Sequence, residues 1–251
     1  MLPIHSRFNA RLGAALVAFA LVGCAGHSGV VPSDQWPAQL ESALPTDVLL
    51  LGEQHDAPDH QRLQRDTVQW LAARGRLAAV VLEMAERGHS TAALARGATE
   101  AQVQSALQWN DAAWPWSAYG PVTMAAVRAG VPVLGGNLPR SAMAAATQET
   151  RWDNHLAATA RQQLLDALQD GHCGLLPAAR LPAMARVQIA RDASMALTAQ
   201  EAVRPGQTVL LVAGGEHVLR HRGIPTHWPQ NIRSRIQVRS ARVSSLSGVI
   251  S

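Results

Sequence analysis

A run of apolar residues, Val48 to Leu51, is followed at once by Gly52 and the polar stretch Glu53-Gln54-His55-Asp56. Continuous apolar runs of this length are typical of strands that are buried on both faces of a parallel sheet. In extended chain, Glu53 and His55 project from the same side of the backbone. The carboxyl ends of such strands are where open α/β sheets bind their ligands. The stretch therefore predicts a ligand site, or, as the simpler alternative, a helix cap at Glu53 and a local hydrogen bond at His55.

A second continuous apolar run, Ala78 to Leu82, also ends in a carboxylate, Glu83. A helix is predicted between the two runs, from Pro58 to about Arg74, and Gly75 ends it. Strand, helix and strand form a βαβ unit, which brings the carboxyl ends of both strands to the same edge of the sheet. Further strands are expected at 131–134, at 208–212 and, at an edge, at 236–238. We therefore predict an α/β fold, a single domain with a mainly parallel central sheet covered by helices.

The remaining segments have mostly helical patterns. A candidate capping box opens a helix at Thr99, since Gln102 stands three residues later. Further helices are expected over 36–43, from near Pro121, after Pro139, over 151–169 and over about 181–202. Gly135 and Gly136 are expected to turn the third strand into the helix that follows it.

Residues 1–23 have the features of a signal peptide, because Arg7 and Arg11 precede the apolar run 12–22. That run is shorter than the roughly 20 residues that a membrane-spanning helix needs. The sequence L-V-G-C before residue 25 resembles the lipobox of bacterial lipoproteins, which implies cleavage before Cys24 and acylation of Cys24 by chains such as palmitate. A secretory peptide with a chance cysteine is the alternative. Residues 24–35 are then the lipidated cysteine and a flexible tether, and residues 36–251 the folded domain.

The composition excludes some classes of function. The chain has two cysteines, Cys24 and Cys173, so a lipidated Cys24 leaves Cys173 without an intrachain partner. Its cationic side chains are all arginine, and the formal net charge is only +4. Interspersed charges of both signs give no basic patch, and we expect no nucleic-acid partner.

The strand ends together carry Glu53, His55, Glu83, Asn137 and, after the fourth strand, Glu216 with His217. Gathering carboxylates at one edge destabilises a fold, because like charges repel and desolvation is costly, so the pattern favours a site. Three kinds of chemistry suit it. A metal ion could be bound by Glu53, His55, Glu83 and His217; a hydrolase could use a histidine as general base; or these groups could bind the polar edge of a cofactor.

An aromatic segment, W-N-D-A-A-W-P-W-S-A-Y-G-P, holds three of the seven tryptophans and the chain's single tyrosine, Tyr119. It is expected to be either a lid over a ligand or an apolar plug beneath the helix near Pro121. Phosphate-binding glycine loops and a G-x-S-x-G nucleophile turn are absent from the sequence, which disfavours nucleotide binding and serine hydrolysis.

Seven motifs between Asp47 and Pro225 resemble, in the same order, those of the ChaN-like haem-binding lipoproteins. They are L-L-L-G-E-Q-H-D, V-V-L-E-M, W-S-A-Y-G-P, G-V-P-V-L-G-G-N-L-P-R, Q-I-A-R-D-A-S-M-A, A-G-G-E-H-V and R-G-I-P. The resemblance implies an iron-regulated bacterial lipoprotein in which a homodimer can enclose two stacked haems, with tyrosine bound to iron. The aromatic segment leads us to expect that Tyr119, Trp114 and Trp116 contact the porphyrin, and His172 is a further candidate for haem binding. If Tyr119 is buried beneath its helix, then either His172, Cys173 or His89 is the iron ligand or haem binding is lost.

The function expected from the sequence is haem binding for iron or haem uptake at the bacterial cell envelope. The protein is expected to be anchored through Cys24 in the outer membrane, facing the periplasm. A binding protein is favoured over an enzyme. The alternative is a metal-dependent hydrolase, because the wider superfamily resembles erythromycin-esterase-like and Tiki-type proteins. In that interpretation Glu53, His55, Glu83 and His217 form the active site.

Overall fold

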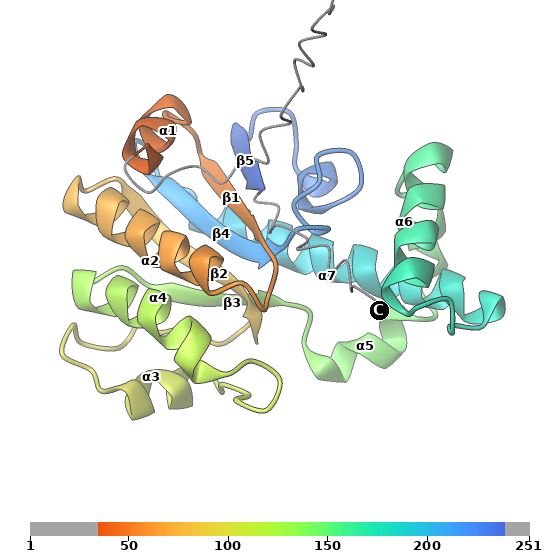
Figure 1. Cartoon of the computed structure of the whole chain (residues 1–251), viewed down its shortest axis with the longest axis horizontal. Coiled ribbons are helices and arrows are strands. Elements are labelled where there is room, and N and C mark those ends of the chain that lie inside the picture. The colour runs from red at the N-terminus through yellow and green to blue at the C-terminus, as the bar shows by residue number, and fades with distance from the viewer. Residues whose placement is uncertain (1–34, 239–251) are drawn as a thin grey trace, which may run out of the picture.

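The structure is a computed structural model that describes residues 35–238, and its centre is one parallel sheet of five strands in the order β3-β2-β4-β1-β5 (Figure 1). The strands are β1 (Val48–Glu53), β2 (Leu77–Glu86), β3 (Val133–Asn137), β4 (Thr208–Gly214) and β5 (Ser234–Val238). The α-helices are α1 (Trp36–Ser42), α2 (Pro58–Ala73), α3 (Glu100–Ala106), α4 (Trp116–Ala129), α5 (Arg140–Ala146), α6 (Ala158–Gly171) and α7 (Leu181–Ala202). Short 3-10 helices are η1 (Thr150–Asn154), η2 (Ala178–Arg180) and η3 (Ile224–His227).

The two faces of the sheet are covered by different helices. Alternate residues of β1 point to opposite faces, so Leu49 and Leu51 join the core with α1, α2 and α4, while Val48 and Leu50 join the core with α7. Figure 1 shows α2 and α4 on one side of the sheet and α7 on the other, with α6 standing apart beside α7. Both cores are buried, which accounts for the uninterrupted apolar runs of the central strands.

The predicted α/β fold is confirmed, and three segment boundaries need correction. The third strand is β3, two residues later than expected, so Gly135 and Gly136 lie within the strand and not in a turn. A Cβ on Gly135 would lie 2.0 Å from the backbone oxygen of Glu86, so only glycine permits this close approach. The sheet thus uses the glycines for packing next to a register shift in β2.

Two helices also begin elsewhere than predicted. Helix α4 begins at Trp116, five residues before Pro121, because the Asp111 carboxylate accepts a hydrogen bond of 2.7 Å from the Trp116 backbone N–H. The segment expected to be one helix over 151–169 is divided into η1 and α6. The capping box at Thr99 is confirmed, with reciprocal bonds between Thr99 and Gln102.

The predicted signal peptide and Cys24 lie outside the described residues, as does the tether apart from Gln35. No helix in the part of the chain that the structure describes is long and apolar enough to cross a membrane.

Candidate functional site

The predicted cluster lies at the carboxyl edge of the sheet. Glu53 and Asn137 are the last residues of β1 and β3, Glu83 lies in β2 beside its register shift, and His217 follows β4. A Cβ on Gly214 would be 3.0 Å from His55 Nε2 and 3.6 Å from Glu83 Oε2. The predicted juxtaposition of these strand ends is therefore confirmed.

Glu53 belongs to the half of the cluster that faces α2 and α4, because it continues the face of Leu49 and Leu51. Glu53 is 4 % exposed, and its carboxylate accepts hydrogen bonds from the Tyr119 hydroxyl at 2.6 Å, from His55 Nδ1 at 2.7 Å and from Gln64 Nε2. The buried carboxylate therefore has three hydrogen-bond donors around it.

The hydroxyl of Tyr119 is engaged as a donor inside the protein. The side chain is 1 % exposed. Burial, and then the adjacent Glu53 carboxylate, raise the pKa of Tyr119 far above its ordinary range, so the phenol stays protonated. A ferric-haem tyrosine ligand must be a phenolate with access to iron. In this arrangement the Tyr119 phenol does not offer that group, and its role as the iron ligand stays a prediction.

His55 is the exposed member of the same half, with 42 % of its side chain exposed. A carboxylate only accepts, so Nδ1 carries the hydrogen toward Glu53 and Nε2 is the nitrogen left near Gly214. The hydrogen bond to Glu53 raises the pKa of His55 more than burial lowers it. Trp114 contacts the ring edge-on, with ring centroids 4.8 Å apart. The imidazole is thereby held in one orientation and remains open to solvent.

Glu83 belongs to the half that faces α7. It accepts hydrogen bonds from Arg191 Nη2 at 2.6 Å and from the Gly214 backbone N–H at 2.7 Å. Arg191 also donates to Asn137 Oδ1 at 2.9 Å. Although burial raises the pKa of Glu83, the charges of His217 and Arg191 outweigh it and hold the pKa well below its usual range. Glu83 is therefore a buried carboxylate that is ionised at neutral pH.

His217 lies between two carboxylates, with Nδ1 2.6 Å from Asp192 and Nε2 3.5 Å from Glu83. Burial lowers its pKa, but the two neighbouring carboxyl groups more than compensate and raise it to about 10. Burial raises the pKa of the Asp192 carboxyl. We assign the proton of the pair to His217, because Glu83 also attracts it.

The predicted metal ligands are engaged with protein partners. The four residues divide into the pairs Glu53–His55 and Glu83–His217, and each pair has its own donors. Among residues 35–238, no group of three or more His, Cys, Asp or Glu side chains is arranged to hold a metal ion.

Of the other predicted haem contacts, Trp114 and Trp116 lie in one aromatic cluster with Trp109 and Tyr119, and His172 lies apart from it. The Trp116 indole N–H donates to Glu100 at 2.8 Å, and the Trp114 backbone oxygen accepts from the Trp109 indole N–H at 2.8 Å. These tryptophans, of which Trp116 is the first residue of α4, are partly buried and pack against the core that α2 and α4 form with the sheet. His172 is exposed at the end of α6, which stands apart from α4 (Figure 1). The aromatic segment and His172 therefore do not line one site.

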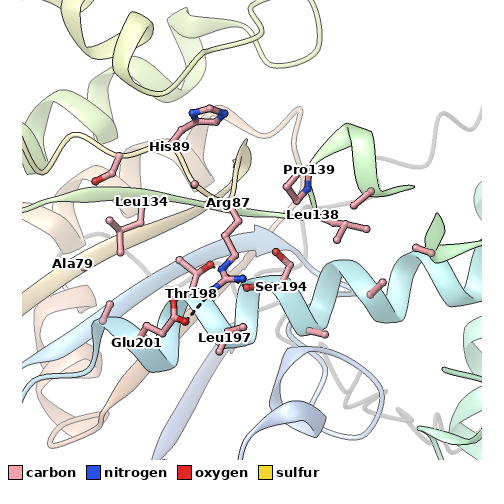
Figure 2. Close-up of a pocket in the computed structure, with 18 of the residues that line it drawn as sticks. Ala79, Arg87, His89, Leu134, Leu138, Pro139, Ser194, Leu197, Thr198 and Glu201 are labelled. Carbon is pink, nitrogen blue, oxygen red and sulfur yellow. Dashed lines mark hydrogen bonds and ion pairs between the residues drawn. The ribbon is translucent and has the colours of Figure 1, made fainter. Parts of the chain in front are cut away.

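A second candidate site is a groove of about 910 Å³ between α7 and the β3 edge of the sheet (Figure 2). Its walls are small and apolar, with Ala142 and Ala145 from α5 facing Ala190 and Ala193 from α7. The charged and polar residues that line it include Arg87, His89, Glu149, Arg151, Glu201 and Arg204. Figure 2 shows Arg87 reaching across to Glu201, with His89 on the other side of Arg87 from α7. The volume lies within the range of small-molecule sites, roughly 300–1,000 Å³.

The sequence analysis gave no role to Arg191 and Asp192, which contact the strand-end cluster, or to the residues of the groove. Arg191 and Asp192 were visible as an adjacent charged pair in a helix whose neighbours are largely small and apolar, and that pattern could have placed them against the sheet. Nothing singled out the groove, because its alanines are also ordinary helix residues.

Comparison with known proteins decides the family. The family model described as "Haem-binding uptake, Tiki superfamily, ChaN" matches residues 39–227. The chain belongs to this ChaN family. A solved structure described as cofacial heme binding to ChaN of Campylobacter jejuni has 23 % sequence identity and a TM-score of 0.66. The match covers 80 % of this chain and 84 % of that chain, and it shows a shared fold. Comparison with curated proteins gives no match.

Proposed function

We propose that this ChaN-family protein binds haem as its cargo, in the groove between α7 and β3, and serves haem or iron uptake at the bacterial cell envelope. Membership of a haem-binding uptake family supports the ligand. The observation that carries the proposal is the groove itself. It is a large, mostly apolar cavity, and its lining also includes arginine side chains and His89.

The groove fits the chemistry of haem. Haem is a flat apolar macrocycle with two anionic propionates and an iron that takes axial side-chain ligands. Alanine walls allow a flat ring to approach backbone closely. The lining has three arginines, of which Arg87 pairs with Glu201 and Arg151 with Glu149, so its charged side chains carry a net positive charge through Arg204. Arg151 also covers the Trp152 ring, with its guanidinium carbon 4.5 Å from the ring centroid. The Tyr119 region fits less well, because its phenol is buried and already bonded to Glu53.

A hemin titration of the full chain in detergent tests the proposal. We expect saturable growth of the Soret band at a fixed ratio of haem to protein. Ala193→Trp places a large side chain in the groove and should weaken binding at least about tenfold, a loss of roughly 1.4 kcal/mol. Gln200→Trp, an exposed position of the same helix outside the groove lining, is the matched control. Equal binding by both variants would exclude the groove.

The membrane anchor is part of the same proposal. The lipobox-like sequence before Cys24 supports lipidation of Cys24 and attachment to the outer membrane, facing the periplasm. Cys24→Ala should move the protein from the membrane fraction to the soluble fraction. A variant that stayed on membranes after a high-salt wash would count against the anchor.

A haem-dependent homodimer is also proposed, supported by the cofacial haem arrangement described for the Campylobacter jejuni relative. Light scattering should show a doubling of mass when hemin is added. An unchanged mass at saturation would exclude this assembly.

A hydrolase activity at the strand ends is the second candidate function, favoured by one specific observation. His55 is half-exposed and is oriented by the buried carboxylate of Glu53, which is how a general base is positioned. Turnover of ester or peptide substrates should then be lost in Glu53→Gln. Turnover that a chelator abolishes would instead support a metal bound by Glu53, His55, Glu83 and His217. No turnover of any substrate in a broad panel would argue against the enzyme.

A further inference from the structure

Two histidines from segments far apart in the sequence stack against each other beside α7. His155 follows η1 and His227 ends η3, and both 3-10 helices pack on α7. The two ring centroids are 4.0 Å apart, and the rings are nearly parallel, with an angle of 10° between them. Trp152 contacts both imidazoles edge-on, with its ring centroid 5.8 Å from that of His155 and 5.9 Å from that of His227. The imidazole pair therefore joins η1 to η3.

The hydrogen bonds of the pair show that both rings are neutral in this arrangement. The Thr226 hydroxyl donates to the Gly223 backbone oxygen at 2.8 Å, so it accepts from His155 Nε2 at 2.9 Å. The neutral His155 ring then has no hydrogen on Nδ1. Within residues 35–238 the His227 ring nitrogens make no hydrogen bond, and neither imidazole forms an ion pair with a carboxylate. A proton added to either ring would therefore have no anionic partner.

The charged side chains around the pair do not compensate such a proton. They include Arg151 and Asp153 of η1, Arg161 of α6, and Arg186, Arg191 and Asp192 of α7. Asp153 pairs with Arg161 and Arg186, and Asp192 pairs with His217. These carboxylates are thus bound by other cations and leave the imidazole pair without a counter-charge.

The segment that carries His155 also forms one end of the groove. Glu149, Arg151 and Trp152 line the groove beside α5, so Trp152 contacts both the groove and the imidazole pair. Asp153 ties η1 to α6 and α7, and the hydrogen bond from Arg186 lowers the pKa of Asp153, so this tie persists in mild acid. If the imidazoles separate, Trp152 can therefore move while η1 stays attached to the helices.

We propose that the stack of His155 on His227 is a pH-sensitive switch of the groove, in which a proton on either imidazole separates η1 from η3, moves Trp152 and weakens haem binding. This inference rests on the proposed function, because it takes haem as the ligand of the groove. The physical reason is that a charge without a partner is costly in a partly buried stack and is relieved when the ring reaches water. The groove then holds haem at neutral pH and releases it in acid.

The direction of the switch follows from the burial of the two rings. Burial, and then the neighbouring His155, lower the pKa of His227 from 6.5 to about 3, and burial lowers the pKa of His155. The stability of the stack is therefore fully present above pH 6.5 and is lost as the pH falls below it. For His227 alone, the released state gains about tenfold over the stacked state for each pH unit below 6.5.

Hydrogen exchange of the full chain in detergent, without haem, tests the switch itself. The Trp152 indole nitrogen is buried from solvent, so exchange of its N–H with water reports the release of η1. Its protection factor, corrected for the intrinsic effect of pH on exchange, should fall by about tenfold per pH unit below 6.5 in the wild-type protein. His227→Phe keeps a flat ring that takes up no proton, so the fall should be smaller. His221→Phe, at an exposed histidine that bonds to Gln163, should behave as wild-type.

Hemin titrations test whether the switch acts on the groove. One pH unit above 6.5, wild-type and His227→Phe should bind hemin equally well. One unit below 6.5, wild-type should bind more weakly than His227→Phe, by up to about tenfold. Comparing the two proteins at one pH cancels the effect of pH on hemin itself. Circular dichroism melts at neutral pH check the fold, and His227→Gln, which is also neutral at every pH, replaces the variant if His227→Phe does not fold.

The outcomes separate the inference from the function. Protection of Trp152 that does not fall in acid, or that falls equally in wild-type and His227→Phe, overturns the switch and leaves haem binding standing. A difference in protection without a difference in hemin affinity in acid overturns the coupling to the groove. Absence of saturable wild-type binding at neutral pH overturns the proposed function, and the control of haem binding with it.

Discussion

Tyr119→Phe removes the phenol hydroxyl, and with it the hydrogen bond to Glu53 and the only tyrosine that titrates at alkaline pH. The chain has no lysine. The phenylalanine ring fills the same buried space, beside Trp109 and Trp114, so only the hydroxyl is lost. That hydroxyl donates to the charged Glu53 carboxylate, and bonds of this type contribute about 1.5–3 kcal/mol. Glu53 keeps His55 and Gln64 as donors in the variant. We therefore expect the free energy of unfolding at neutral pH to fall by about 1.5–3 kcal/mol.

The alkaline behaviour of Tyr119 gives a sharper test. Its folded pKa lies above the unfolded value of 10.0, so the folded state holds the phenolic proton more tightly. The stability that this proton provides is fully present below pH 10.0 and is lost as the pH rises above it. The wild-type free energy of unfolding should then fall by up to about 1.4 kcal/mol per pH unit. With no lysine in the chain, few other groups titrate in this range.

Urea unfolding at a series of alkaline pH values measures this slope, and phenolate absorbance reports directly on the tyrosine. Wild-type protein should show no phenolate signal above pH 10 until it unfolds, and Tyr119→Phe should lack the slope. A phenolate signal that develops in the folded protein near pH 10 would refute the buried hydrogen bond. It would also restore Tyr119 as a candidate iron ligand.

Three further predictions follow from the contacts. Folding raises the pKa of His217 from 6.5 to about 10, so the stability that its proton provides should be fully present below pH 6.5 and be lost as the pH rises toward 10. In His217→Asn the free energy of unfolding should lack this dependence on pH. The same dependence in wild-type and variant would contradict the contacts of His217 with Asp192 and Glu83. Glu53→Gln should lower the pKa of His55, as followed by NMR, because the charged acceptor is gone; an unchanged titration would exclude the pair. Leu50→Ala, in a fully buried strand, should lower the free energy of unfolding by about 2–5 kcal/mol. Leu175→Ala, at an 84 % exposed position, should change it by less than about 0.5 kcal/mol. Similar losses in the two variants would contradict the packing.

The sequence was sufficient to predict the central strands because their apolar runs have one explanation. Val48–Leu51 and the corresponding run of β2 are buried on both faces, and the order of strands and helices then requires a parallel sheet. The meeting of Glu53, His55 and Glu83 followed from that geometry alone.

The sequence failed where local rules competed with tertiary contacts. Gly135 has the composition of a turn, but it serves the close approach of β3 to Glu86, a contact that no local pattern reveals. Pro121 is typical of a helix start, yet α4 begins five residues earlier, at Trp116, whose backbone N–H donates to Asp111. The hydrogen bond of Tyr119 to Glu53 was likewise missed, because the residues that it joins, on α4 and β1, are 66 positions apart in the sequence.

The groove could not be predicted from the sequence, since segments that are distant in sequence line it: the segment after β2, β3, α5 and α7. Haem binding in this groove is our central claim, and the hemin titration of wild-type protein beside Ala193→Trp and Gln200→Trp tests it most directly. We expect saturable binding by wild-type and Gln200→Trp, and binding by Ala193→Trp that is weaker by about tenfold or more. Undiminished binding by Ala193→Trp, or no saturable binding by the wild-type chain, would contradict the claim.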